Sequence, residues 1–513
     1  MLANSASLPL PIDYLYKGLA INPNAPAATD SQETVNYQEL VYRVEALALA
    51  LHERYPSGAR IALCAENHIG HLTAYLAILA AGCIWIPVNP KNGASLNRQL
   101  LEQSSPSLVI VDEASQTTLP EGITVPVMSL TSTRDTDQSA QALVEKYYQM
   151  PFTAMRPEPQ EIMAIKFTGG TTGTPKGVMQ SHHNVSAVVE SLRELYEFDQ
   201  HDCNLAVAPL THGGSHYILP VLAVGGRHIL LEKPEVSRIM QAFASSVSIC
   251  FMPPTLIYKI FDTPGVSARN FPYLRFLTYG AAPMPTSRIR QIRALIGDRL
   301  STLYGQTEAP MVITALSSKD MADPALQLSV GKACRFSEVA IIGKEQSMLG
   351  PREVGEIAVR GDIVMSGYYQ QQDATSGAFY QGWLLTGDLG YLDEQGYLFI
   401  QGRSKEVIIS GGFNVYPAEV EAALFALDSV AEAAVFGLPD PYWGEQVAAA
   451  VVLSEPGIAD ETELKAALKD SLGPVKTPKA FYFLDALPRN PVGKVVRRDI
   501  RQLIAKQQEQ DHA

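Results

Sequence analysis

The chain has 513 residues, of which 46% are hydrophobic and 18% are charged, and its formal net charge at pH 7 is −13. This composition is typical of a globular protein with a large core, and the acidic balance argues against a nucleic-acid-binding surface, which needs clustered cations. Five scattered cysteines show no paired spacing, and the N-terminus lacks a charged segment followed by an apolar one. We therefore expect reduced thiols, no signal peptide and a cytoplasmic protein.

Short apolar runs alternate with helical patterns over most of the first 400 residues. Residues 37–55 have helical spacing. Residues 72–88 are short for a transmembrane helix, so we interpret them as a core helix that ends near Gly82, before a buried strand. Further strands are expected at 60–65, 107–112, 162–167, 205–210, 227–231, 248–253, 274–280 and 301–305. The alternation predicts mostly parallel sheets covered by helices, with ligands at the carboxyl ends of the strands.

The pattern changes from about residue 352, where short β segments are joined by glycine turns. These segments predict an antiparallel, β-rich subdomain. After Gly402, helices are expected at 418–427 and 461–472, and strands at 431–437, 447–453 and 480–485. We therefore predict an α/β protein with a large N-terminal domain, residues 1–403, and a small mobile α+β C-terminal domain, residues 404–513.

Residues 166–184 read KFTGGTTGTPKGVMQSHHN, a loop rich in glycine and threonine around Lys176. An apolar strand precedes it and a helical pattern follows, which is a common arrangement for binding phosphates. The loop is not a Walker A motif, because Pro175 precedes the lysine and Gly177 follows it. Taken alone, the loop is also compatible with a plain surface segment.

Three other stretches carry groups that suit a nucleotide. Tyr304 and Glu308 lie in STLYGQTEAP, where an aromatic ring suits stacking on a base and a carboxylate suits Mg²⁺. Asp388 follows a glycine turn, as carboxylates that bind a ribose diol do. Lys494 lies in LPRNPVGKVVRRDI, a loop bracketed by proline and glycine. Each feature alone has a plain structural explanation.

Five segments, in this order and spacing, resemble the acyl-adenylate-forming enzymes: AMP-dependent acyl-CoA synthetases, stand-alone adenylation domains and firefly-luciferase-like proteins. They are FTGGTTGTPKGV, TYGAAPMP, YGQTE, TGDLGYLDEQGYLFIQGRSKEVIISGGFNVYPAEVE and PRNPVGKVVRRDI, and the resemblance extends from about residue 30 to residue 505. It implies that a carboxylate attacks the α-phosphate of ATP to give an acyl-adenylate and pyrophosphate. The thiol of CoA then displaces AMP to give a thioester.

The resemblance also implies a role for each matching residue. The ATP phosphates would be bound by Thr168, Gly169, Gly170, Thr171, Thr172, Gly173 and Lys176, with Gly169 where the family often has serine. Adenine and ribose would be bound by Gly280, Ala281, Ala282, Tyr304, Asp388, Ile400 and Arg403. Thr307 would contact the α-phosphate, and Glu308 with Thr172 would hold Mg²⁺. Lys494 would bridge the substrate carboxylate and the α-phosphate.

In this family the C-terminal domain alternates between two poses about one connector residue, which here matches Lys405. One pose brings in Lys494 for adenylation, and the other brings in Ser410, Gly411 and Gly412 to line a tunnel for the thiol. The acyl pocket would be lined by His212, Gly213, Gly214, Gly280, Gly305 and Met311. His212 would lie at the pocket mouth as a catalytic residue, and the two glycines after it predict a roomy pocket.

The sequence of the predicted acyl pocket limits the class of acid that the protein could accept. No Asp, Glu, Lys or Arg lies between Pro209 and Gly226, which disfavours an amino acid, because its ammonium group needs a partner when buried. The lack of an evident pocket arginine disfavours dicarboxylates such as malonate. We therefore expect ATP, Mg²⁺ and CoA to act on an apolar monocarboxylic acid, fatty or aromatic, in a monomer or homodimer. The alternatives are an enzyme that loads a carrier protein, a luciferase-like oxygenase and a non-enzymatic binding protein.

Overall fold

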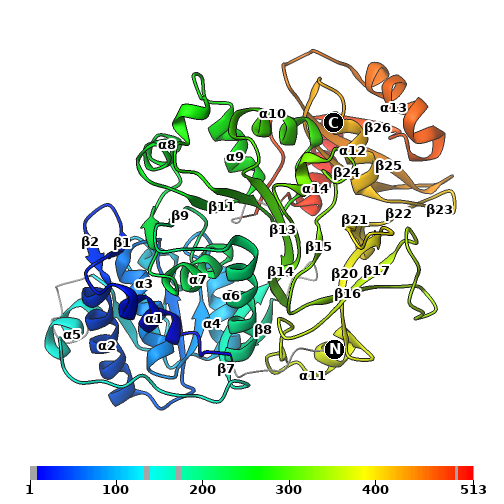
Figure 1. The fold of residues 1–513 in the computed structure, drawn as a ribbon. Helices are drawn as coiled ribbons and strands as arrows, with labels where there is room; N and C mark the ends of the chain where they lie inside the picture. Colours follow the sequence, from blue (N-terminus) through cyan, green and yellow to red (C-terminus); the bar gives the residue numbers. More distant parts are fainter. Residues whose placement is uncertain (1–7, 132–138, 169–174, 491–494, 512–513) are drawn as a thin grey trace.

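The computed structural model describes residues 8–131, 139–168, 175–490 and 495–511. Two large sheets with helices on their faces are built mainly from the part of the chain before about residue 335 (Figure 1). A β-rich layer follows on one side, and the C-terminal unit lies above that layer in the same view. The predicted α/β class and the β-rich subdomain are confirmed.

One sheet has seven strands and carries the glycine- and threonine-rich segment. Their order is β18 (Gly367–Tyr368), β8 (Lys176–Ser181), β7 (Ile162–Thr168), β4 (Ile84–Pro87), β3 (Arg60–Cys64), β5 (Leu108–Val111) and β6 (Val127–Ser129). The strands from β7 to β6 are parallel, whereas β8 and β18 are added antiparallel at one edge. The helices in this part are α2 (Tyr37–Arg54), α3 (Ile69–Ala80), α4 (Ala94–Ser104) and α5 (Ala140–Tyr147).

Two of these helices confirm sequence predictions. α2 begins where the Asn36 side chain accepts a hydrogen bond from the backbone N–H of Glu39, at 2.8 Å. α3 is buried along nearly its whole length and leads into β4, as predicted for residues 72–88. Across the described part of the chain, no helix is both long enough and apolar enough to cross a membrane.

The second large sheet has nine strands. Their order is β15 (Lys332–Ala333), β14 (Ala309–Leu316), β13 (Leu300–Gln306), β12 (Phe276–Tyr279), β11 (Ile249–Met252), β9 (Cys203–Ala206), β10 (Arg227–Leu230), β1 (Pro26–Thr29) and β2 (Thr34–Asn36). The six strands from β13 to β1 are parallel. The accompanying helices are α1 (Asp13–Ile21), α6 (His182–Tyr196), α7 (Ile218–Leu222), α8 (Val236–Ser245), α9 (Pro254–Phe261) and α10 (Thr286–Ile296).

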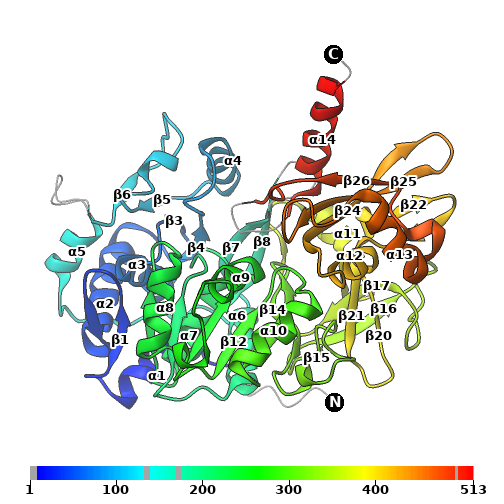
Figure 2. The same ribbon diagram turned by 90° about the horizontal axis from the view of Figure 1, so that it is seen from above.

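The two remaining sheets are smaller. The β-rich layer contains β16 (Glu338–Ile342), β17 (Gly355–Arg360), β19 (Phe379–Tyr380), β20 (Trp383–Leu392) and β21 (Leu398–Arg403), all antiparallel, with α11 (Gln372–Ala378) beside them. The C-terminal unit contains β22 (Ile408–Ser410), β23 (Phe413–Val415), β24 (Val430–Asp440), β25 (Gly444–Leu453), β26 (Ala480–Phe483), α12 (Pro417–Phe425), α13 (Glu461–Lys476) and α14 (Arg497–Asp511). Figure 2 shows α14 projecting from this unit.

The segment around Lys176 differs from the predicted strand, loop and helix. β8 lies between the loop and α6, and it pairs with β7 so that Thr168 faces Lys176. α6 therefore starts only at His182, where Ser181 and Asn184 form a capping box. Because its first N–H groups are already bonded, this helix end has no free N–H groups to offer a phosphate, and the predicted phosphate site rests on the loop residues alone.

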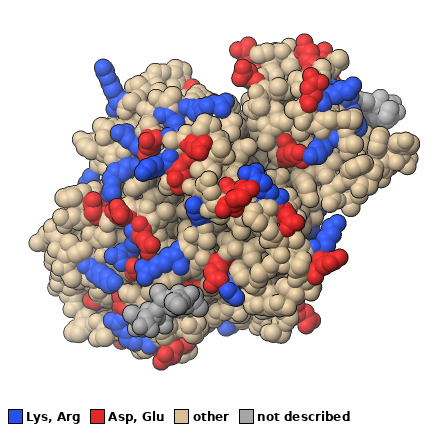
Figure 3. All heavy atoms as spheres, turned by 45° about the vertical axis from the view of Figure 1, so that its right-hand side comes forward, with Lys and Arg blue, Asp and Glu red and all other residues tan. Residues whose placement is uncertain are grey.

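The surface charge is mixed on the face shown in Figure 3, where Lys and Arg side chains are interspersed with Asp and Glu. All five cysteines lie in described segments and are unpaired.

Candidate active site

Three of the predicted nucleotide-binding residues form one hydrogen-bonded group. Tyr304 lies in β13, Asp388 in β20 and Arg403 at the end of β21, directly across from Asp388. The Tyr304 hydroxyl donates to Asp388 Oδ2 at 2.7 Å, and Arg403 Nε lies 2.7 Å from Oδ1. Burial and the neighbouring carboxylate hold the pKa of Tyr304 well above its usual value, so its hydroxyl stays a donor.

A second group of predicted site residues includes Lys176, the first residue of β8. Thr168 and Lys176 form the last residue pair before that loop, while Gly169, Gly170, Thr171, Thr172 and Gly173 lie outside the described residues. Lys176 Nζ lies 4.7 Å from the ring centroid of Tyr368, whose hydroxyl donates to Glu308 Oε1 at 2.9 Å. Tyr368 therefore connects the predicted phosphate-binding lysine to the predicted magnesium-binding carboxylate.

Sequence reasoning did not identify Tyr368. No motif marks it, and it reaches this position because β18 pairs with β8, with Tyr368 opposite Val178. Only knowledge of that strand pairing identifies it, because 60 residues separate it from Glu308 along the chain.

The segment that carries Thr307 and Glu308 is fixed through its backbone. The fully buried Gln180 donates from Nε2 to the carbonyl of Thr307 at 2.8 Å, and the N–H of Met365 donates to the carbonyl of Glu308 at 2.8 Å. These bonds tie the turn between β13 and β14 to the neighbouring sheet. Both predicted side chains therefore start from a constrained backbone.

The backbone of the residues that are predicted to bind adenine is also constrained. Gly280 follows β12, and Ala281 has a φ of 67°. A non-glycine residue in the left-handed region costs free energy, and such residues are enriched near functional sites. Ala282 comes next, and Ile400 lies in β21, beside the strand that bears Asp388.

The expected room beside Gly213 and Gly214 is not present. A Cβ at Gly213 would lie 2.8 Å from the Phe251 ring, and one at Gly214 would lie 2.3 Å from the carbonyl oxygen of Ala208. A Cβ at Gly280 would lie 3.1 Å from the opposite edge of the same ring. These glycines therefore allow close packing around Phe251, and the prediction that they open space is wrong.

Gly305 and Met311 belong to the tight connection between β13 and β14. A Cβ at Gly305 would lie 2.4 Å from the backbone nitrogen of Met311, and Met311 has a φ of 60°. His212 precedes the short 3-10 helix η2 (Gly213–Tyr217). Burial, reinforced by the charge of Lys166, lowers the pKa of His212 to about 4, so its imidazole is neutral near pH 7.

The predicted hinge and thiol-tunnel residues lie at the start of the C-terminal unit. Lys405 is the middle residue of the 3-10 turn η5 (Ser404–Glu406), directly after β21. Gly411 and Gly412 have φ values of 58° and 81° and form the two-residue turn between β22 and β23, flanked by Ser410. Glycine is required there because both residues adopt left-handed backbone conformations.

Lys494 lies outside the described residues. On either side of its loop, Arg489 and Val495 form an antiparallel bridge, and Arg489 pairs with Glu432 at 2.9 Å. The charges of Arg489 and Glu432 also act on Tyr258 of α9, whose pKa is raised mainly by burial. The base of the Lys494 loop therefore lies near α9, which follows β11 in the nine-stranded sheet.

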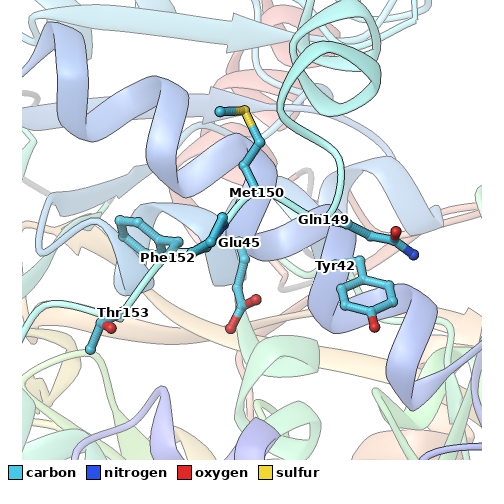
Figure 4. Close-up of a pocket in the computed structure, with 7 residues that line it drawn as sticks. Tyr42, Glu45, Gln149, Met150, Phe152 and Thr153 are labelled. Atoms are coloured by element: carbon cyan, nitrogen blue, oxygen red, sulfur yellow. The ribbon is translucent and has the colours of Figure 1, made fainter.

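A separate cavity of about 340 Å³ lies away from these groups (Figure 4). Its lining comes from α2 and the segment after α5, namely Tyr42, Glu45, Gln149, Met150, Pro151, Phe152 and Thr153. None of these residues is a predicted site residue, so the cavity is not part of the predicted nucleotide site.

Comparisons with known proteins match nearly the whole chain. The family model described as AMP-binding enzyme matches residues 17–369, and the model for the AMP-binding enzyme C-terminal domain matches residues 419–494. A CoA ligase of Rhodococcus jostii, named for a methyl-dioxo-octahydroindenyl propanoyl group, is 33% identical over 93% of this chain and 95% of that protein.

The chain is also similar to a fatty-acid–CoA ligase in sequence and to an amide bond synthetase in structure. A medium/long-chain-fatty-acid–CoA ligase of Mycobacterium tuberculosis is 34% identical over 71% of this chain, a match that spans 65% of that protein. An amide bond synthetase of Marinactinospora thermotolerans has a similar solved structure, with a TM-score of 0.89 and 30% identity over 96% of this chain and 99% of that chain.

Proposed function

The chain belongs to the AMP-binding enzyme family and is an AMP-forming acid–thiol ligase that uses ATP and CoA, and we propose that its acid is an apolar monocarboxylic acid, fatty or aromatic. Both sequence relatives named above, from Mycobacterium tuberculosis and Rhodococcus jostii, are CoA ligases, so loading of a carrier protein, the alternative acceptor, is not favoured. The fatty-acid relative and the relative named for a fused-ring propanoyl group support an acid with a large apolar body.

One observation carries this proposal: the Tyr304–Asp388–Arg403 group and the Lys176–Tyr368–Glu308 group meet in one short segment, because only three residues lie between Tyr304 and Glu308. In our proposal the first group binds adenosine, with the Asp388 carboxylate holding the ribose hydroxyls. The second binds the phosphates. Thr307, between them, meets the α-phosphate, where the acid attacks.

Glu308 fits a magnesium ion chemically. Mg²⁺ prefers oxygen ligands and is usually held by one or two carboxylates together with substrate phosphates. Tyr368 bonds Oε1 of Glu308 and so orients the carboxylate. Bound there, Mg²⁺ would neutralise charge on the phosphates of ATP, with Thr172 as the second proposed ligand. In the described residues, no cluster of three His, Cys, Asp or Glu side chains is arranged to hold a metal ion.

The remaining roles follow from charge. Two anions must approach each other in the first half-reaction, and fixed cations stabilise the charge that is redistributed. We assign this task to Lys176 and Lys494. The neutral imidazole of His212 suits the pocket mouth, because it adds no charge beside the substrate carboxylate. Lys405 is the proposed hinge between the domains 1–403 and 404–513, and Ser410, Gly411 and Gly412 line the proposed thiol path.

The test is pyrophosphate release from ATP with a panel of fatty and aromatic acids, each with and without CoA. We expect one acid class to give a strong signal that rises with CoA and yields the corresponding thioester. A signal that ignores CoA but rises with a carrier protein or an amine would contradict the thiol ligase assignment. Release of pyrophosphate with amino acids only would contradict the acid class.

A further inference from the structure

A lysine is buried beside the two histidines of the acyl-pocket segment. Lys166 belongs to β7 and is 8% exposed. Its Nζ lies 3.3 Å from Nε2 of His216 and 5.2 Å from the ring centroid of Trp85. Burial lowers its pKa to about 7, and no carboxylate in the described residues offsets that effect.

The titratable groups around Lys166 are neutral near pH 7. Nδ1 of His216 lies 3.3 Å from the carbonyl oxygen of Gly213, so Nδ1 carries the proton and Nε2 accepts from Lys166. Burial and the Lys166 charge lower the pKa of His216 well below its usual value, as they do for His212. Tyr75 is neutral as well, because burial raises its pKa. One N–H group of the Lys166 amine therefore donates to His216, and at least one further N–H group is left to donate elsewhere.

The Lys166 side chain lines a cavity of about 10 Å³, which is about the space of one water molecule. The cavity lies between β7, α3, α6 and the η2–α7 segment, and its lining residues are Tyr75, Met163, Lys166, Val185, Val188, Val189, Ser215, His216 and Leu219. His216 lies four residues after His212, on the segment assigned to the acyl pocket. The cavity therefore borders the segment proposed to line the acyl pocket, and it has room for about one water-sized group.

An apolar side chain at position 166 would fill this site without the desolvation cost of an amine. A buried donor is compensated when a ligand supplies an acceptor, and a site built that way discriminates strongly against ligands that lack one. Lys166 and Thr168 share one face of β7, because side chains alternate along a strand.

We propose that Lys166, oriented by His216, is a specificity-determining residue that donates a hydrogen bond to an oxygen atom at the end of the acid remote from its reacting carboxylate. The oxygen is a ketone carbonyl or one oxygen of a second carboxylate. This inference rests on the proposed function and revises its acid class to acids with an apolar body and one distal oxygen-bearing group. A second carboxylate would replace the monocarboxylic acid by a dicarboxylic one.

The experiment compares three sets of acids that share one carbon chain and end in a methyl group, a methyl ketone or a carboxylate, each at several chain lengths. The kcat/KM for pyrophosphate release is measured with CoA for the wild type, Lys166→Met and Lys332→Met. The last variant is the matched control, because Lys332 is exposed and also lies over a tyrosine ring, 4.3 Å from the centroid of Tyr397.

We expect the wild type to prefer a ketone or carboxylate terminus, and Lys166→Met to reduce that preference about tenfold to a hundredfold, mainly through KM. Lys332→Met should keep the wild-type preference. Assays at about pH 6 and about pH 8.5, on either side of the Lys166 pKa of about 7, separate the two ligands. Preference for a carboxylate should fall at the higher pH because the amine loses its charge, whereas preference for a ketone should persist.

A preference that Lys166→Met leaves unchanged would overturn the inference while the proposed function stands. A wild type that prefers the methyl-terminated acids would do the same. If no acid of any chain length or terminus releases pyrophosphate with CoA, the proposed function fails, and the inference fails with it.

Discussion

At the residue scale, one tyrosine lies between Lys176 and the Glu308 carboxylate. Tyr368 places its ring under Lys176 and its hydroxyl on Glu308. Since it would touch neither ATP nor the acid in the proposed scheme, it is a positioning residue. Removing its hydroxyl should therefore weaken the binding of the proposed magnesium ion by Glu308.

Tyr368→Phe keeps the ring and removes the hydroxyl. We expect kcat/KM for pyrophosphate release to fall about threefold to tenfold, the usual value of one hydrogen bond. The Mg²⁺ concentration for half-maximal activity should rise, because the freed carboxylate is less well oriented. Tyr369→Phe is the matched control, since the Tyr369 hydroxyl only accepts a bond from Gln370 at 3.1 Å. Equal magnesium dependence in all three proteins would rule out this role.

Lys166 also leads to a prediction about the pH dependence of folding stability, which is independent of catalysis. Its pKa is about 7 in the folded protein and about 10.4 when unfolded. Between these values the unfolded chain binds one more proton than the folded chain, so rising pH stabilises the wild type, by about 1.4 kcal/mol per pH unit. Lys166→Met lacks this contribution.

The melting temperature of Lys166→Met should therefore exceed that of the wild type most clearly at about pH 7, and the difference should shrink toward about pH 9. Thermal unfolding of both proteins across this range measures it, with Lys332→Met as the exposed control. A difference that stays constant with pH would show that Lys166 does not titrate there.

At the scale of elements, the two glycines of the β22–β23 hairpin are required for different reasons. Gly411 and Gly412 both have positive φ values, but only Gly411 faces a neighbour, since a Cβ there would lie 2.7 Å from Trp443. No atom lies within 4 Å of a Cβ at Gly412. Alanine at position 412 therefore adds backbone strain alone, and alanine at position 411 adds a clash as well.

We expect Gly412→Ala to cost about 1 kcal/mol of stability and Gly411→Ala to cost more. If this hairpin lines the thiol path, both variants should slow thioester formation more than pyrophosphate release, with Gly411→Ala the slower. Rates of the two half-reactions, measured separately, test this. Equal slowing of both half-reactions would place the hairpin outside the thiol step.

At the scale of the whole molecule, the proposed hinge joins two units through few residues. η5 connects β21 to β22, and α12 packs against β21. On the far side of the hinge, Arg497 pairs with Glu406 at 2.9 Å and Glu421 at 2.6 Å. The hinge is thereby anchored to the C-terminal unit that would move.

Lys494→Ala tests the two-pose scheme, because one cation should matter for only one half-reaction. We expect pyrophosphate release to fall by several orders of magnitude, while transfer from preformed acyl-AMP to CoA remains near the wild-type rate. Stopped assays of each half-reaction check this. Loss of both to the same degree would contradict alternation between poses.

The sequence by itself determined most of the elements and the candidate residues of the motifs. Strands, helices and glycine turns follow local patterns of apolar spacing and backbone freedom, so β3, β7, α2 and the antiparallel strands β17, β20 and β21 were predictable, whereas β16, which lies before residue 352 in the same layer, was not predicted. The motif residues Tyr304, Asp388 and Arg403 were also identified, because their segments keep a fixed order along the chain. Their meeting in one hydrogen-bonded group agrees with that expectation.

Only the tertiary structure decided which side chains meet from distant parts of the chain. β8 joins β7 before α6 begins, Phe251 fills the space beside Gly213, and Tyr368 reaches Glu308. The pattern around Lys166 gave no sign that its amine is buried beside His216, 50 residues away. Such contacts depend on strand order and on the packing of separate elements, and a local pattern contains neither.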